Sequence, residues 1–127
     1  TDHIAISRAE QCSDSALNSV IALLQALDFK VSVIKDTPGL LVMRTVAMLA
    51  NEAADAVNQN VGSVEAVDTA MTLGVNYPKG PLAWADEVGI DHIGRTLLNL
   101  HQSYGEDRYR LSPLLAQKLF AEGAFYE

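Results

Sequence analysis

The sequence is poor in cysteine, in basic residues and in long apolar runs, and each shortage excludes a class of protein. Cys12 is the one cysteine in 127 residues, so an internal disulfide is excluded and a reducing, cytoplasmic compartment is expected. Lys and Arg number 9 against 16 Asp and Glu, a net charge of −7. This balance disfavours nucleic acid as a partner, because phosphate binding requires clustered basic residues. No apolar run approaches the roughly 20 residues that a membrane-spanning helix requires.

Motifs that hold cofactors or metals are missing too. The sequence has no Gly-x-Gly-x-x-Gly, no phosphate loop and no Cys/His set at zinc spacing. His3, His92 and His101 are scattered along the chain. Glu52 and Asp55 are three residues apart on the polar side of a predicted helix, where carboxylates are usually solvated. We therefore expect no catalytic, cofactor-binding or metal site built from these residues.

The stretch from residue 36 to residue 60 predicts the element around which the rest of the chain is organised. Asp36 and Thr37 predict a helix cap, and Pro38 suits the first helical position. The apolar positions that follow keep the helical period: Val42, Val46, Leu49, Ala53 and Val57. In the first half, apolar side chains cover nearly the whole circumference. Such a helix must be covered on more than one side, so we predict a central helix wrapped by other helices, by a partner subunit or by both.

Arg44 interrupts the apolar start of this helix and allows two interpretations. Its side chain can extend along the surface or form an ion pair at the helix edge. Alternatively, it can contact a partner domain or an anionic ligand. The apolar residues around it predict self-association of the chain.

Residues 1–36 show a different pattern. Residues 3–7 alternate as a short strand, Ser13 or Asp14 can cap a helix, and residues 29–34 give a second strand. Strand, helix and strand predict a parallel pair joined by a crossover. Two strands leave their edges unpaired, so we expect this segment to be the tail of a larger α/β domain or to be covered by another subunit.

Four further helices are predicted after the central one. Ser63 caps the first, which Gly74 ends as a left-handed cap; Pro81 begins the second, Asp91 caps the third, and Ser112-Pro113 opens the last. The predicted fold is mainly α, with several helices around one long central helix and a short strand–helix–strand segment in front. The expected domains are residues 1–36 and 37–127. The chain begins at Thr1 rather than Met, so removal of upstream sequence is expected.

Several motifs together resemble a known family. KDTPGLLVMR, LANEAADAV, SVEAVDTAMTLGVNYPKGPLAWADEVGID and SPLL, in this order, resemble the C-terminal domain of 3-hydroxyacyl-CoA dehydrogenases. Residues 4–36 look like the last strand–helix–strand of the nucleotide-binding domain of that family. The resemblance covers the whole chain and implies a helical domain of the 6-phosphogluconate dehydrogenase C-terminal type.

The resemblance also implies an activity for a longer parent protein. The family reduces NAD while oxidising a 3-hydroxyacyl-CoA to the 3-ketoacyl-CoA, in fatty-acid or aromatic-acid degradation. Its His–Glu pair and its NAD site belong to an upstream nucleotide-binding domain of the same chain. Its helical domain closes over the acyl chain and forms most of the homodimer contact. The resemblance thus implies NAD and acyl-CoA as ligands of the parent, with no cofactor in this stretch.

One departure from the family pattern decides between two hypotheses. The family has Pro-Gly-Phe-x-x-Asn-Arg where this chain has Pro38 to Arg44, so Met43 occupies the position of an Asn that holds the substrate. A thioether donates no hydrogen bond, so the role of that Asn is lost. Arg44, next to it, is the candidate substrate-binding residue. The closing signature is reduced to residues 123–126, Gly-Ala-Phe-Tyr. This pattern resembles the second, degenerate copy in tandem dehydrogenases of the 3-hydroxybutyryl-CoA or phenylacetate type.

The first hypothesis is therefore a domain of an NAD-dependent dehydrogenase that shapes the acyl pocket and the subunit contact. The second is a non-catalytic structural module for oligomerisation that never touches substrate. The residue that distinguishes the two hypotheses is Met43, at the position of the Asn that holds the substrate in the family. For the 127 residues alone, we predict no NAD-dependent turnover of 3-hydroxybutyryl-CoA.

Overall fold

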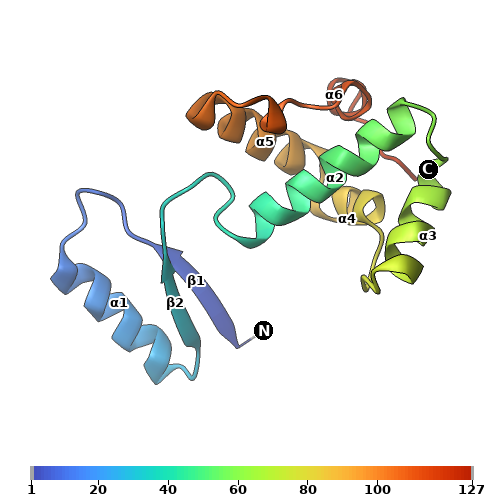
Figure 1. The fold of residues 1–127 in the computed structure, drawn as a ribbon. Coiled ribbons are helices and arrows are strands. Elements are labelled where there is room, and N and C mark those ends of the chain that lie inside the picture. Colours follow the sequence, from blue (N-terminus) through green and yellow to red (C-terminus); the bar gives the residue numbers. More distant parts are fainter. Residues whose placement is uncertain (1, 127) are drawn as a thin grey trace. The chain divides into compact units, whose positions relative to one another are not determined.

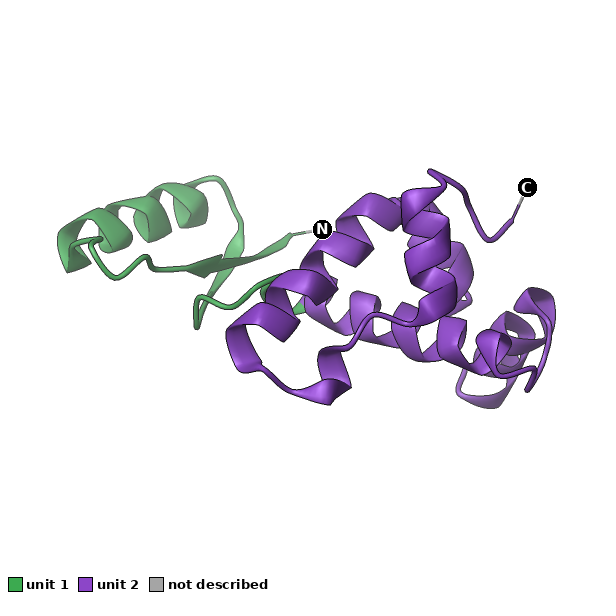
Figure 2. Cartoon of the chain, turned by 90° about the horizontal axis from the view of Figure 1, so that it is seen from above, with its two compact units in different colours: residues 1–41 green, residues 42–127 purple. Residues whose placement is uncertain are grey.

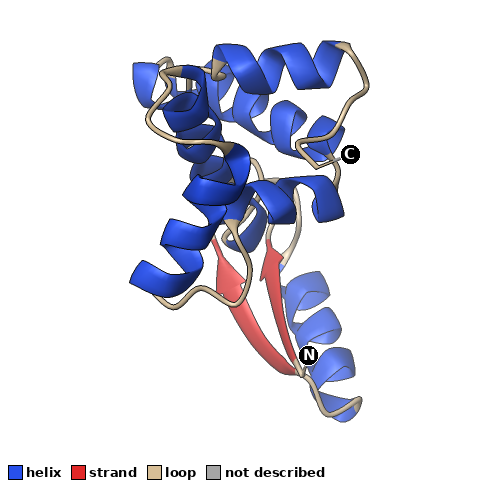
Figure 3. Ribbon diagram, turned by 90° about the vertical axis from the view of Figure 1, so that its right-hand side faces the viewer, coloured by secondary structure: helices blue, strands red, loops and turns tan. Residues whose placement is uncertain are grey.

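The structure is a computed structural model that describes residues 2–126. It divides the chain into two compact units, one up to residue 41 and the other from residue 42 onward (Figure 2). The elements follow in the order β1 (His3–Ser7), α1 (Asp14–Ala26), β2 (Lys30–Ile34), α2 (Val42–Asn58), α3 (Val64–Gly74), α4 (Pro81–Val88), α5 (Ile90–Tyr104), the short 3-10 helix η1 (Asp107–Tyr109) and α6 (Pro113–Phe120) (Figure 1). Helices predominate over the two short strands (Figure 3), which confirms the mainly α fold class.

The first unit is the predicted strand–helix–strand. β1 and β2 pair in parallel, with Ile4 opposite Val31 and Ile6 opposite Val33. The helix between them begins at its predicted cap, because the side chain of Ser13 accepts a hydrogen bond from the backbone N–H of Ala16 at 3.2 Å. None of the described residues 2–41 is fully buried, since two strands and one helix are too few to enclose a core.

The second unit is built around α2, as the sequence predicted. This helix contacts α3, α4, α5 and α6. Its buried side carries small residues that let the neighbouring helices approach closely. The core cluster comprises Ala47, Ala50, Ala53, Ala54, Leu82, Ala85, Ile90, Ile93, Leu97, Leu115 and Phe125. The cover is incomplete at the start of α2, where Leu41 and Val42 are 61% and 72% exposed.

The start of the central helix was predicted wrongly. The helix begins at Val42 instead of Pro38, because two residues in between adopt the left-handed region. The φ angles of Gly39 and Leu40 are +75° and +48°, and a right-handed helix requires negative values. Gly39 adopts this conformation easily because it has no Cβ, so the Pro-Gly pair forms a turn before the helix.

Two other helix ends also differ from the prediction. Gly74 lies inside α3, and the left-handed residue nearby is Asn76, with φ +57°. α5 begins at Ile90 with Gly89 as its cap residue, so Asp91 lies in the first turn. At that position its charge still favours the helix N-terminus. Within residues 2–126, no helix combines the length and the apolar character needed to cross a bilayer.

Candidate functional site

The candidate site predicted at the start of α2 holds one apolar and one charged residue. Met43 is half-buried and packs against the core cluster. Its thioether sulfur is a weak hydrogen-bond acceptor and cannot donate a hydrogen bond. The side chain therefore fills space at this position.

Arg44 lies against two neighbouring aromatic rings, those of Tyr104 and Tyr109. One η nitrogen of its guanidinium donates a hydrogen bond of 2.6 Å to the hydroxyl of Tyr109. Its Cζ lies 5.3 Å from the ring centroid of Tyr104 and 5.7 Å from that of Tyr109, within the range of cation–π attraction. The hydrogen bond to Tyr109 raises the pKa of Arg44 above its usual value. Arg44 thus joins the start of α2 to the end of α5 and to η1.

Asn51 connects the middle of α2 to the connector before α6. Its side-chain amide donates to the carbonyl of Arg110 at 2.8 Å, and its side-chain oxygen accepts from the N–H of Ser112 at 2.8 Å. Only 4% of Asn51 is exposed. A buried amide that is paired in both directions stabilises one arrangement of the backbone it contacts.

Asp68 is the one buried carboxylate among the described residues, and it accepts three hydrogen bonds. It comes from α3 and is 6% exposed. Its two oxygens accept from the N–H groups of Leu82 at 2.8 Å and of Ala83 at 2.9 Å, at the N-terminus of α4. The Tyr126 hydroxyl donates a third bond at 2.9 Å. Asp68 therefore caps a helix that begins many residues later in the chain.

Gly80 makes room for this carboxylate. A Cβ at Gly80 would lie 2.1–2.4 Å from the side-chain atoms of Asp68. The Gly80-Pro81 pair of the YPKGPLAWAD segment therefore has a structural explanation: glycine admits the carboxylate and Pro81 begins α4.

Asp86 holds the end of the described chain. Its carboxylate accepts from the N–H of Phe125 at 2.9 Å and from that of Tyr126 at 2.8 Å. The Phe125 ring is buried in the core cluster. Partial burial of the Tyr126 hydroxyl, together with its bond to Asp68, raises the pKa of Tyr126 to about 12. These contacts fix the reduced Gly-Ala-Phe-Tyr signature against α3 and α4.

The other candidates from the sequence lie apart. His92 is exposed, 3.9 Å from the carboxylate of Asp91, and His101 is exposed on α5. Glu52 is exposed, and Asp55 accepts a bond from Gln59 on its own helix. In the part of the chain that the structure describes, no three His, Cys, Asp or Glu side chains come together as a possible metal site.

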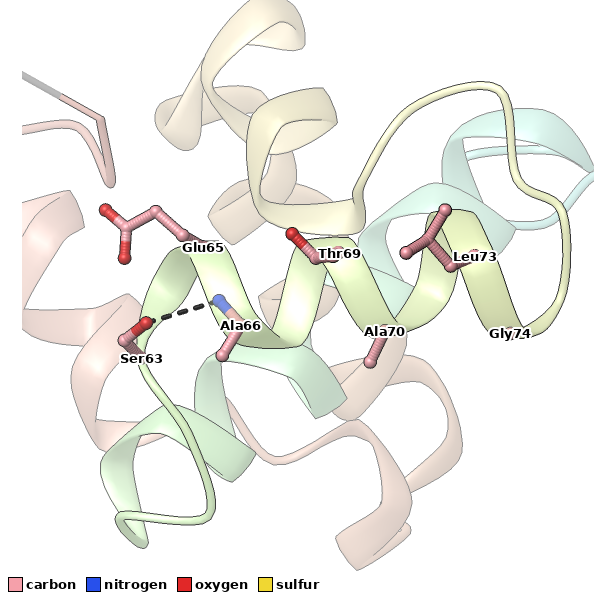
Figure 4. Close-up of a pocket in the computed structure, with 7 residues that line it drawn as sticks. All are labelled: Ser63, Glu65, Ala66, Thr69, Ala70, Leu73 and Gly74. Atoms are coloured by element: carbon pink, nitrogen blue, oxygen red, sulfur yellow. Dashed lines mark hydrogen bonds between the residues drawn. The ribbon is translucent and has the colours of Figure 1, made fainter.

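A shallow concavity runs along α3. It is lined by Ser63, Glu65, Ala66, Thr69, Ala70, Leu73 and Gly74 (Figure 4). Ser63 caps the helix, accepting from the N–H of Ala66 at 3.2 Å. Hydrogen bonds to its own backbone N–H and to Ser63 lower the pKa of Glu65. The lining combines apolar and small side chains with one carboxylate, which suits contact with another apolar surface better than acid–base chemistry.

Three of these polar residues were missed from the sequence. These are Asp68, Asn51 and Asp86, whose bonds to distant segments no local pattern indicates. Their partners lie 14 to 61 residues away in sequence. Helical periodicity describes neighbours within one helix, so the one available signal was the polar residue on an otherwise apolar face, as at Asn51.

The chain is similar to proteins of known type. The model described as 3-hydroxyacyl-CoA dehydrogenase, C-terminal domain, matches residues 39–126, and that described as 3-hydroxybutyryl-CoA dehydrogenase reduced Rossmann-fold domain matches residues 1–38. A 3-hydroxyadipyl-CoA dehydrogenase of Escherichia coli K12 is 47% identical over 96% of this chain and 26% of its own length. A probable 3-hydroxybutyryl-CoA dehydrogenase of Deinococcus radiodurans is 36% identical over 93% of this chain and 42% of its own length.

A solved structure agrees with these matches. The crystal structure of an E. coli K12 3-hydroxybutyryl-CoA dehydrogenase superposes with a TM-score of 0.86 and 47% identity, over 95% of this chain and 26% of that one. The chain therefore spans about a quarter of these E. coli proteins and less than half of the D. radiodurans protein.

Proposed function

The chain belongs to the 3-hydroxyacyl-CoA dehydrogenase family, and on that premise we propose that it serves as the C-terminal part of an NAD-dependent 3-hydroxyacyl-CoA dehydrogenase. The parent would oxidise a 3-hydroxyacyl-CoA to the 3-ketoacyl-CoA in fatty-acid or aromatic-acid degradation. The observation that carries this proposal is the pair of matches over residues 1–38 and 39–126, in the order of a nucleotide-binding domain followed by its helical partner.

Within that parent, the chain would help to shape the acyl pocket and would supply no catalytic group. Asp68, which is buried, and Asp86, which is half-buried, already accept hydrogen bonds from backbone N–H groups, so neither is free to act as a base for a substrate. Met43 fills the Asn position of the family with an apolar side chain. The NAD site and the catalytic pair would lie in an upstream nucleotide-binding domain, and this unit would form part of the acyl pocket.

Arg44 is the residue that we propose for contact with the acyl-CoA. A guanidinium carries five N–H donors, and the bond to Tyr109 uses one of them. The two tyrosine rings hold the group in a fixed orientation, which favours binding of an anion. In the parent enzyme, Arg44→Ala would raise KM for the acyl-CoA and leave KM for NAD unchanged. Arg95→Ala, at an exposed position of α5, is the control.

We further propose a cytoplasmic homodimer. Leu41 and Val42 remain exposed at the start of α2 and offer an apolar contact for a second subunit. Residues 1–36 and 37–127 would act as separate domains, and the chain would be the second, non-catalytic copy of a tandem arrangement.

The test compares the 127 residues with the parent chain. Reduction of NAD by 3-hydroxybutyryl-CoA and by 3-hydroxyadipyl-CoA is followed for both proteins at equal concentration. The parent is expected to turn over at least one substrate, and the 127 residues neither. Activity of the short chain above a protein-free control, or an inactive parent, would contradict the proposal.

The alternative function is a structural oligomerisation module. It is favoured by the exposed apolar side chains of the helical unit, among them Leu73 and Phe120. A parent truncated before residue 37 discriminates between the two functions. If the module only assembles subunits, the truncated parent keeps its KM for the acyl-CoA and loses its dimer. If the unit shapes the acyl pocket, that KM rises.

A further inference from the structure

The connector between α5 and α6 is tied to α2 at two points. At the first, the guanidinium of Arg44 donates to the hydroxyl of Tyr109 at 2.6 Å. At the second, Asn51 donates to the carbonyl of Arg110 at 2.8 Å and accepts from the N–H of Ser112 at 2.8 Å. Arg44 and Asn51 are roughly two helical turns apart, so their side chains leave α2 on the same side.

The connector has little attachment of its own. Within the described chain, the other hydrogen bonds of residues 106–111 join neighbours in the connector, such as the N–H of Tyr109 to the carbonyl of Glu106 at 3.0 Å. A single 3-10 turn such as η1 is too short to be stable by itself. The position of the connector therefore depends on the packing of Tyr109, which is 4% exposed, and on the two side chains from α2.

Among residues 2–126, Arg44 is held by neutral groups alone. No carboxylate forms an ion pair with its guanidinium there, although the chain has 16 Asp and Glu against 9 Lys and Arg. Its neighbours are the Tyr109 hydroxyl and the rings of Tyr104 and Tyr109. A carboxylate would hold the guanidinium as firmly but would also neutralise it. Neutral partners leave the charge available to an anion, so the orientation of Arg44 depends on where the connector places Tyr109.

We propose that Asn51 is a positioning residue for Arg44. This role rests on the acyl-CoA contact proposed for Arg44. Without the Asn51 amide, the N–H of the buried Ser112 and the carbonyl of Arg110 lose their partner, and the backbone shifts to find another. The hydroxyl of Tyr109, the preceding residue, moves with it. The guanidinium then loses the orientation in which it meets its ligand.

An amide suits this position because it is uncharged and pairs in both directions. One side chain satisfies both an N–H and a C=O of the connector. A carboxylate only accepts, so Asn51→Asp would keep the bond from Ser112 and lose the bond to Arg110. Its negative charge, roughly two turns from Arg44, would also compete with an anionic ligand for the guanidinium. Asn51 therefore fixes the connector without weakening the charge of the site.

The first test is the steady-state kinetics of the parent chain. Asn51→Ala is expected to raise KM for the acyl-CoA about threefold to tenfold, with kcat and KM for NAD unchanged. Asn51→Asp, which keeps the size of the side chain, is expected to act in the same direction. Asp68→Asn is the matched control, because it weakens buried hydrogen bonds to α4 instead of those to the connector. All variants are compared at a temperature at which circular dichroism shows them folded. An equal rise of KM in the control would overturn the proposal.

A double-mutant cycle shows whether Asn51 acts through Arg44. In an Arg44→Ala background, Asn51→Ala is expected to raise KM for the acyl-CoA no further. Equal effects of Asn51→Ala with and without Arg44 would refute the positioning role.

The geometry is tested without substrate in the 127-residue chain. A guanidinium held by a hydrogen bond and two rings rotates slowly, so separate NMR signals are expected for the Nη protons of Arg44, assigned by their loss in Arg44→Lys. Asn51→Ala is expected to merge these signals and Asp68→Asn to preserve them. Separate signals in Asn51→Ala would overturn the proposal. If the signals merge but Arg44→Ala leaves KM for the acyl-CoA unchanged, Asn51 does position Arg44, and the acyl-CoA contact is what fails.

Discussion

Replacing Asp68 by asparagine is expected to lower the free energy of unfolding of the helical unit by about 2–4 kcal/mol. The substitution keeps the size of the side chain and removes its charge. Two hydrogen bonds from the start of α4 and one from Tyr126 now converge on the carboxylate. The amide has one accepting oxygen and presents donors on its other side.

The magnitude follows from the geometry. The amide oxygen can keep the bond from the N–H of Leu82, but its NH₂ group then faces the N–H of Ala83. Losing a hydrogen bond to a charged acceptor costs about 1.5–3 kcal/mol. Losing the negative charge at the N-terminus of α4 adds about 0.3–1 kcal/mol. The hydroxyl of Tyr126 can rotate and accept from the amide, so its bond is not counted as lost.

Urea unfolding measures this effect. Circular dichroism follows the helices, and the fluorescence of Trp84 reports on α4, where the indole packs 5.9 Å from the ring of Tyr77. Glu52→Gln, which neutralises an exposed carboxylate on α2, is the matched control and is expected to change stability by less than about 0.5 kcal/mol. If Asp68→Asn were as stable as this control, the assignment of Asp68 as the distant cap of α4 would be wrong.

Two further predictions concern the same network. Gly80→Ala forces its new methyl group into the space of the Asp68 carboxylate. It is expected to cost about 1–3 kcal/mol in the same urea titration, and less when Asp68 is already alanine; additive losses would show that the two sites are independent. Tyr126→Phe is expected to flatten the alkaline limb of stability. The folded-state pKa of Tyr126 is raised to about 12 from its ordinary value near 10. Its contribution is therefore complete below about pH 10 and is lost as the pH rises towards about 12. Unfolding free energies measured through this window for both proteins test the assignment, and parallel curves would refute it.

Helix starts that carry a local marker could be predicted from the sequence. Ser13 and Ser63 cap the helices that follow them, and Pro81 and Pro113 occupy first helical positions. Each marker acts within one turn of the helix, so its effect can be read from a few adjacent letters. The start of α2 escaped prediction because Leu40 adopts a left-handed conformation, which leucine rarely does.

The site was only partly predictable, for a related reason. Arg44 stands out because it interrupts the apolar start of one helix, and Met43 stands out because it departs from the family motif. The partner of Arg44 is Tyr109, 65 residues later in the sequence, and no periodicity connects the two. Asp68 and Asp86 likewise bind backbone groups of distant segments, so their roles depend on how the helices pack and became visible only in the folded chain.

The arrangement of these contacts has a consequence for biosynthesis. Arg44 and Asn51 lie near the beginning of the helical unit and are paired with Tyr109 and with the backbone at Arg110 and Ser112, while Phe125 completes the core. During translation, these partner residues are synthesised after α3, α4 and α5. The part of the apolar side of α2 that α6 covers therefore stays exposed until almost the whole unit has emerged, and in that period chaperones bind exposed apolar segments.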